Sequence, residues 1–162
     1  MDLRDGRKDG YAVDREMNNA PPDDDGFHHI DAHRIRFEPP DVMLVQTNGT
    51  IHPNQCDVFF NLVYGLCPDR PFYILRDAQN GGVHGSETRS RILELSDPAR
   101  FAGIAIFGAS FRLRVLVTML HKTVRTLKRS FPDATFVDTE AEARAWIQAH
   151  RQRAISAQKT KD

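Results

Sequence analysis

A glycine-rich loop holds the residues of this sequence that are best suited to chemistry. Residues 76–89, RDAQNGGVHGSETR, bring Asp77, His84 and Ser86 into the chain order of one class of catalytic triad. A triad depends on geometry, however, and the loop lacks the Gly-x-Ser-x-Gly sequence of a nucleophile elbow. Its glycines fit neither the phosphate-binding pattern G-x-x-x-x-G-K-S/T nor the dinucleotide pattern G-x-G-x-x-G. The sequence therefore predicts no catalytic residue and no nucleotide site here, and the protein is not expected to be an enzyme.

The same loop is better suited to contact a partner. It follows an apolar strand, where open α/β sheets place their binding sites, and its glycines allow mobility and close approach of another backbone. Ser86 is predicted to cap the helix that follows, with Glu87 at the positive end of the helix dipole. We expect Ser86, His84 and Thr88 to form a partner-binding site, with Ser86 as a candidate for phosphorylation.

Histidines and cysteines offer possible metal ligands. His28, His29 and His33 are closely spaced, but they lie beside a polar arm without a nearby cysteine, and a structural zinc site needs four ligands. Cys56 and Cys67 belong to one predicted helix, where their separation of about 16 Å is too long for a disulfide. We therefore expect exposed histidines, buried thiols, no metal and no cofactor.

A predicted helix over residues 111–129 carries a basic face. Its members at helical spacing are Arg114, Thr118, His121, Lys122, Arg125, Lys128 and Arg129. This face is either an ordinary solvated surface or a contact for an anion, which would be a phospholipid head group, an acidic partner or the chain's own acidic arm.

Length and charge limit the classes of function. The chain has 162 residues and a formal net charge of zero, and its Asp and Glu residues are concentrated in residues 1–32. This mild charge separation falls well short of the basic surface of a nucleic-acid-binding protein. Without an apolar signal segment or a run of 18 apolar residues, the chain is expected to be cytoplasmic.

The hydrophobic pattern predicts one domain between two arms. We expect a disordered acidic arm over residues 1–32, a domain over 33–150 and a flexible basic tail over 151–162. Strands are predicted at residues 34–38, 42–47, 72–76, 103–107 and 134–137, and helices at 53–67, 86–95, 111–129 and after a capping box at Thr139–Glu142. Strands alternating with helices predict an α/β fold with a mostly parallel sheet, whose first strand pairs antiparallel. Trp146 is expected to anchor the last helix in the core.

Three stretches carry a family resemblance. They are EPPDVMLVQTNGTI, GIAIFGASFRLRVLVTMLHKTVRTL and FVDTEAEARAWI. In this order they resemble the SpoIIAA-like family of the STAS superfamily, over residues 33–150. The resemblance implies a βα superhelix related to the CRAL-TRIO lipid-carrier fold, and regulatory or binding modules without an established reaction. Well-understood members of the superfamily have a phosphorylatable serine in an Asp-Ser-Ser/Thr-Gly sequence after the third strand; Ser86 stands at that place here, without that sequence.

Three functions stay open after these observations. The first is a cytoplasmic, non-enzymatic regulatory module that binds another protein. The alternative is a protein that binds lipid or an anionic membrane surface, and a third, weaker option is a hydrolase that uses Ser86. A nucleic-acid partner is not expected.

Overall fold

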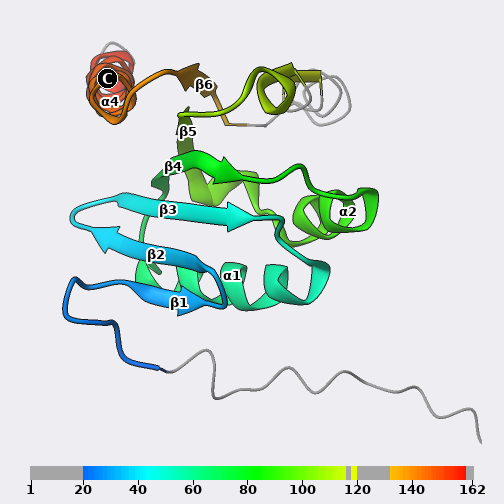
Figure 1. Ribbon diagram of the computed structural model, residues 1–162. Coiled ribbons are helices and arrows are strands. Elements are labelled where there is room, and N and C mark those ends of the chain that lie inside the picture. The colour runs from blue at the N-terminus through cyan, green and yellow to red at the C-terminus, as the bar shows by residue number, and fades with distance from the viewer. Residues whose placement is uncertain (1–19, 116–117, 120–131, 160–162) are drawn as a thin grey trace, which may run out of the picture.

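The computed structural model describes residues 20–115, 118–119 and 132–159, which form a six-stranded sheet covered by helices (Figure 1). The strands are β1 (His28–Ile30), β2 (His33–Glu38), β3 (Val42–Gly49), β4 (Phe72–Gly81), β5 (Phe101–Phe107) and β6 (Ala134–Val137). They lie in the sheet in chain order; β1, β2 and β3 pair antiparallel, and β3 to β6 pair parallel. The predicted α/β class and mostly parallel sheet are confirmed.

Helices lie on both faces of this sheet. They are α1 (Pro53–Leu66), α2 (Ser86–Leu95), the short 3-10 turn η1 (Pro98–Arg100) and α4 (Glu140–Lys159), and residues 111–115 and 118–119 are also helical. Side chains of β4 alternate between the faces: Phe72 and Ile74 join the cluster under α1, whereas Tyr73 and Leu75 join the cluster under α4. This alternation explains why the strand is apolar throughout.

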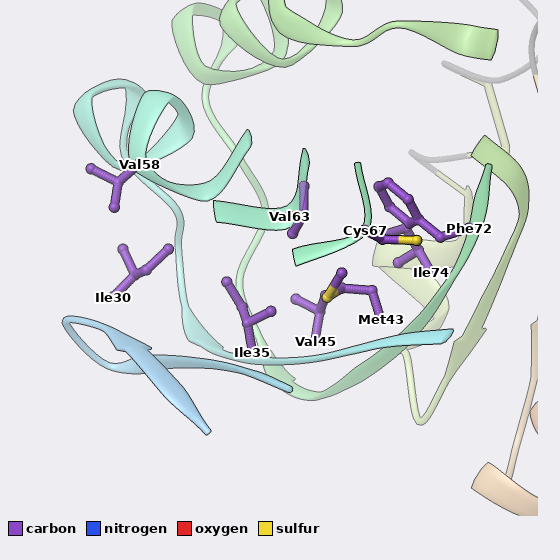
Figure 2. Packing of buried hydrophobic residues seen from close by; sticks show 9 residues of the cluster. All are labelled: Ile30, Ile35, Met43, Val45, Val58, Val63, Cys67, Phe72 and Ile74. Carbon is purple, nitrogen blue, oxygen red and sulfur yellow. The ribbon is translucent and has the colours of Figure 1, made fainter. Parts of the chain in front are cut away.

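The face under α1 and α2 contains the larger apolar cluster (Figure 2). Ile35, Met43 and Val45 of the sheet point towards Val58 and Val63 of α1, and Ile35, Met43 and Val63 are completely buried. The two helices are also tied to one another. Arg91 of α2 pairs with Asp57 of α1, and the Tyr64 hydroxyl donates a hydrogen bond to the Leu95 carbonyl oxygen at 3.1 Å.

On the opposite face, α4 packs against β4, β5 and β6 through its apolar stripe. Ala143 and Ile147 are buried, and Trp146 packs half-buried at the rim of the same cluster. A Cβ atom at Gly103 would lie 3.1 Å from the Trp146 ring, so the glycine makes room for the indole. The predicted capping box is confirmed, because Thr139 accepts a hydrogen bond from the Glu142 amide and the Glu142 carboxylate accepts one from the Thr139 amide.

The predicted domain bounds are wrong at both ends of the described chain. Within the predicted arm, Phe27 and Ile30 are buried, β1 pairs with β2, and the guanidinium groups of Arg34 and Arg36 stack on the Phe27 ring at 4.6 and 4.5 Å. In the predicted tail, α4 continues to Lys159, and Arg151 forms an ion pair with Asp41. Residues 1–19 and 160–162 lie outside the described residues.

Candidate functional site: an apolar cavity with a cationic end

A cavity of about 210 Å³ lies between the sheet and the helices α1 and α2. Its apolar walls come from Val45 (β3), Ile74 (β4), Ile104 and Ile106 (β5), Cys56, Phe59 and Phe60 (α1), Ile92 (α2), and Ile51, Phe101, Leu113 and Ala134. The strand residues reach it because alternate positions of β3, β4 and β5 point to this face. For comparison, an apolar protein cavity of about 150 Å³ holds a benzene molecule.

One end of the cavity is polar and carries positive charge. Thr47, Arg76, His84 and Arg89 form this polar end, and Ser96 is the only other polar side chain among the described lining residues. Asp and Glu are absent from that part of the lining. The cavity therefore combines an apolar body with a cationic head site.

Arg76 is the central group of the polar end. It follows Ile74 on the inward face of β4, so its side chain enters the layer between the sheet and the helices. The Nε atom is shielded from solvent without a hydrogen-bond partner, and Nη2 contacts Thr47 Oγ1 at 3.5 Å and His84 Nε2 at 3.2 Å. Burial lowers the pKa of Arg76 to about 10, which leaves the guanidinium charged at neutral pH.

His84 lies beside Arg76 and is buried. Its Nδ1 atom accepts a hydrogen bond from the Ile51 amide at 3.3 Å, so a neutral imidazole must carry its proton on Nε2. That Nε2–H then faces the Arg76 Nη2 atom, which is also a donor. Burial, followed by the charge of Arg76, lowers the pKa of His84 to about 4, and the ring is therefore neutral at pH 7.

The glycines of the loop 76–89 allow two backbones to pack closely. Strand β4 extends to Gly81, five residues beyond its predicted end, and Gly81 pairs with Gly49 of β3. The Gly82 amide donates to the Gly49 carbonyl oxygen at 2.8 Å, and a Cβ atom at Gly82 would lie 2.5 Å from Thr50 Oγ1. The first half of the predicted loop is thus a strand, because backbone pairing continues through it.

The predicted partner-binding residues lie on different sides of this segment. Ser86 is exposed in the first turn of α2, whereas His84 and Thr88 are buried, with the Thr88 hydroxyl donating to the Ile51 carbonyl oxygen at 3.1 Å. The expected helix cap is also wrong. Gly85 is the N-cap residue and Ser86 is the first helical residue, so the Ser86 hydroxyl lies one position too late to cap the helix.

The possible triad is not assembled in the described structure. The Asp77 carboxylate accepts a hydrogen bond from the Gln79 amide, and His84 contacts Ile51 and Arg76. Ser86 shares no hydrogen bond with either side chain among the described residues. These positions do not link a nucleophile to a base.

Most of the predicted basic face lies outside the described residues: His121, Lys122, Arg125, Lys128 and Arg129. Arg114 is described, and its guanidinium pairs with Asp138 and donates to the Ala109 carbonyl oxygen at 3.0 Å. Arg114 therefore stabilises the loop before α4 instead of projecting freely towards a partner.

The histidines and cysteines are the residues that the sequence indicates as possible metal ligands. His29 contacts Asp23 at 2.7 Å, whereas His33 is buried and accepts a hydrogen bond from the Asn48 amide, so the prediction of an exposed residue is wrong for His33. Within the described ranges, no three His, Cys, Asp or Glu side chains are grouped to hold a metal ion. Cys56 and Cys67 are free and buried as predicted, and burial raises the pKa of the Cys56 thiol to about 11.

Comparison with known proteins gives a fold relationship. No protein-family model matches the sequence, and no curated protein matches it. A solved structure does match, with a TM-score of 0.53 and 16% sequence identity, over 71% of this chain and 91% of the other. It is an uncharacterized protein of the DUF3478 family with a SpoIIAA-like fold, from Shewanella loihica PV-4. The present chain has a SpoIIAA-like fold.

The SpoIIAA-like fold confirms the architecture that the three sequence stretches predicted. It does not by itself identify a ligand or a partner, because one fold serves many functions. None of the helices in the described part of the chain is long and apolar enough to cross a membrane.

Proposed function

We propose that this SpoIIAA-like protein is a non-enzymatic binding module whose ligand is a small apolar molecule held in the cavity. The observation that supports this function is the cavity itself, with a volume of about 210 Å³ and walls made largely of aliphatic and aromatic side chains. An apolar cavity does not hold water well, so an apolar ligand gains both the hydrophobic transfer energy and the dispersion contacts that the empty walls lack. This proposal develops the lipid-binding alternative from the sequence.

The non-enzymatic part of the proposal is supported by the polar groups at the cavity. Arg76 and Arg89 supply strong hydrogen-bond donors, and buried His84 uses Nδ1 to accept the Ile51 amide hydrogen. Such groups bind and orient a ligand, whereas hydrolysis would need an activated nucleophile beside a base.

A regulatory role fits the same site. His84 and Arg89 line the cavity, and the segment that carries them also exposes Val83, 50% accessible, and Ser86. Ligand occupancy can therefore alter a surface that a protein partner reads. Phe111, 80% exposed, adds an apolar anchor that a protein partner could cover. The partner and the cytoplasmic location remain predictions.

The test is calorimetric titration of the purified full chain with 1-octanol, a small apolar probe without charge. We expect saturable binding near one molecule per chain. Ile92→Trp should remove that binding, because the indole would fill part of the cavity that Ile92 lines. Ile155→Trp is the matched control, since Ile155 is 48% exposed on α4, on the opposite face of the sheet.

Circular dichroism must show that both variants keep the parent fold. Absence of saturable binding to the parent protein would refute the proposed function. Equal binding by the parent and Ile92→Trp would show that 1-octanol binds outside this cavity.

A further inference from the structure

We propose that the natural ligand carries a carboxylate, which Arg76 and His84 bind at the polar end while its apolar chain fills the cavity; the ligand class is a medium-chain fatty acid. This inference rests on the proposed function and adds the head group to it. The charge, the hydrogen-bond geometry and the size of the site support it.

The charge at the polar end lacks a counterion. Arg76 forms no ion pair with any described residue, its Nε atom has no hydrogen-bond partner, and its neighbour Arg89 adds a second positive charge to the lining. The adjacent Asp77 offers no compensation, because it follows Arg76 on the strand and therefore points to the other face, where its carboxylate accepts from the Gln79 amide. A cation shielded from solvent is normally paired, so a site in which no described residue pairs with Arg76 is suited to binding an anionic ligand.

The contact between His84 and Arg76 also brings two hydrogen-bond donors together without an acceptor between them. The Ile51 amide occupies His84 Nδ1, so the Nε2–H of the neutral ring and the Arg76 Nη2 donor point at one another across 3.2 Å. With the opposite tautomer, the donor conflict would only move to the Ile51 amide. An oxygen placed beside both nitrogens accepts from each of them and removes the conflict, which is the arrangement that a carboxylate oxygen supplies.

Arg89 and Thr47 hold these two donors in place. Arg89 Nη1 donates to the His84 carbonyl oxygen at 2.6 Å, and Thr47 Oγ1, which donates to the Asp77 carbonyl oxygen at 3.2 Å, accepts from Arg76. The donor pair is therefore organised before an anion arrives, so little side-chain ordering opposes binding.

The volume of the cavity indicates how much of an apolar chain it can enclose. Since about 150 Å³ accommodates the six carbons of benzene, the 210 Å³ observed here suits a chain of about eight carbons. A lipid with two long acyl chains would exceed this volume, whereas a fatty acid of medium length matches it. A carboxylate supplies one negative charge, which is enough to pair with the Arg76 guanidinium at the centre of the polar end.

The experiment compares three head groups on the same eight-carbon chain. The full-length protein is titrated calorimetrically at pH 7.5 with sodium octanoate, 1-octanol and octyl phosphate. We expect octanoate to bind at least tenfold more tightly than 1-octanol, and octyl phosphate to bind no more tightly than octanoate. Tenfold corresponds to about 1.4 kcal/mol, which is within the range of a hydrogen bond to a charged group.

Variants assign that preference to the polar end. In Arg76→Met, octanoate affinity should fall to the level of 1-octanol, while 1-octanol affinity stays within twofold of the parent. Arg153→Met is the control, because Arg153 is exposed on α4 and should leave all three affinities unchanged. Should Arg76→Met fail to fold, His84→Asn tests the same idea: its side-chain oxygen can still accept the Ile51 amide hydrogen, but the Nε2–H donor is lost, so octanoate preference should fall at least threefold.

The outcomes separate this inference from the proposed function. Equal affinities for octanoate and 1-octanol would overturn the carboxylate site and leave the apolar cavity function intact. A preference for octanoate that persists in the polar-end variant that folds would also overturn the carboxylate site. Tighter binding of octyl phosphate than of octanoate would overturn it too, and would show that the polar end prefers a phosphate head group. Failure of all three probes to bind would overturn both proposals.

Discussion

His84 is a buried imidazole whose surroundings disfavour its charged form. Burial is the main cause, and the positive charges of Arg76, His33 and Arg89 add to it, so the pKa of His84 falls to about 4. Burial likewise lowers the pKa of His33. Both histidines release their protons on folding at mildly acidic pH, because the unfolded chain binds protons near pH 6.5.

This shift predicts the pH dependence of stability. Since the unfolded state binds more protons than the folded state between pH 6.5 and 4, the free energy of unfolding should decrease as pH falls through this window. From pH 6.5 to pH 5 His84 should account for a loss of about 1.5 kcal/mol. Urea unfolding of the parent and of His84→Asn measures this loss. The variant should lose less unfolding free energy between pH 6.5 and pH 5, and the loss that it still shows should reflect His33. An identical slope in both proteins would contradict the assignment.

The importance of Arg76 could have been read from strand alternation. The sequence shows Phe72, Ile74 and Arg76 at every second position, which places an arginine on the same buried face as two apolar residues. What alternation could not predict is the meeting of Arg76 with His84, because that contact depends on how β4 leaves the sheet and enters α2.

At the scale of elements, the junction between β3 and β4 requires glycine for steric reasons. Around Gly82, a Cβ atom would lie 3.0 Å from the Gly49 carbonyl carbon and from the Thr50 amide nitrogen, both of which belong to the backbone. The helix bounds of α1 and α2 were predictable because apolar spacing, Pro53 and the Asp97–Pro98 break are local signals. The extension of β4 was not, since it depends on pairing with β3, which is distant in sequence.

Replacing Gly82 should therefore cost stability. Gly82→Ala should lower the free energy of unfolding by about 1–3 kcal/mol, the usual cost of adding a group to a packed site. Gly65→Ala is the matched control, because the space around Gly65 is open and alanine favours the helix by up to about 1 kcal/mol. Denaturant unfolding compares the two. Similar stability in the two variants would show that the β3–β4 junction can shift to accept a side chain.

At the scale of the whole molecule, segments outside the predicted domain belong to the folded unit. Residues 20–32 contain few apolar side chains, so composition alone predicts an arm, yet Phe27 and Ile30 belong to two different buried clusters. At the other end, Arg151 pairs with Asp41 and lies over the Tyr73 ring at 5.4 Å. These contacts connect residues that are far apart in the chain, so local composition does not reveal them.

The contribution of the N-terminal segment can be measured with two phenylalanines. Phe27, 6% exposed, packs with Leu44 and carries Arg34 and Arg36 on its ring, whereas Phe111 is 80% exposed. Phe27→Ala should lower the free energy of unfolding by about 3–5 kcal/mol, because it removes a buried aromatic ring. Phe111→Ala should change it by less than about 0.5 kcal/mol, as expected for a surface position. Equal effects in chemical denaturation would mean that residues 20–32 do not fold cooperatively with the sheet, whereas a large difference would extend the domain to include them.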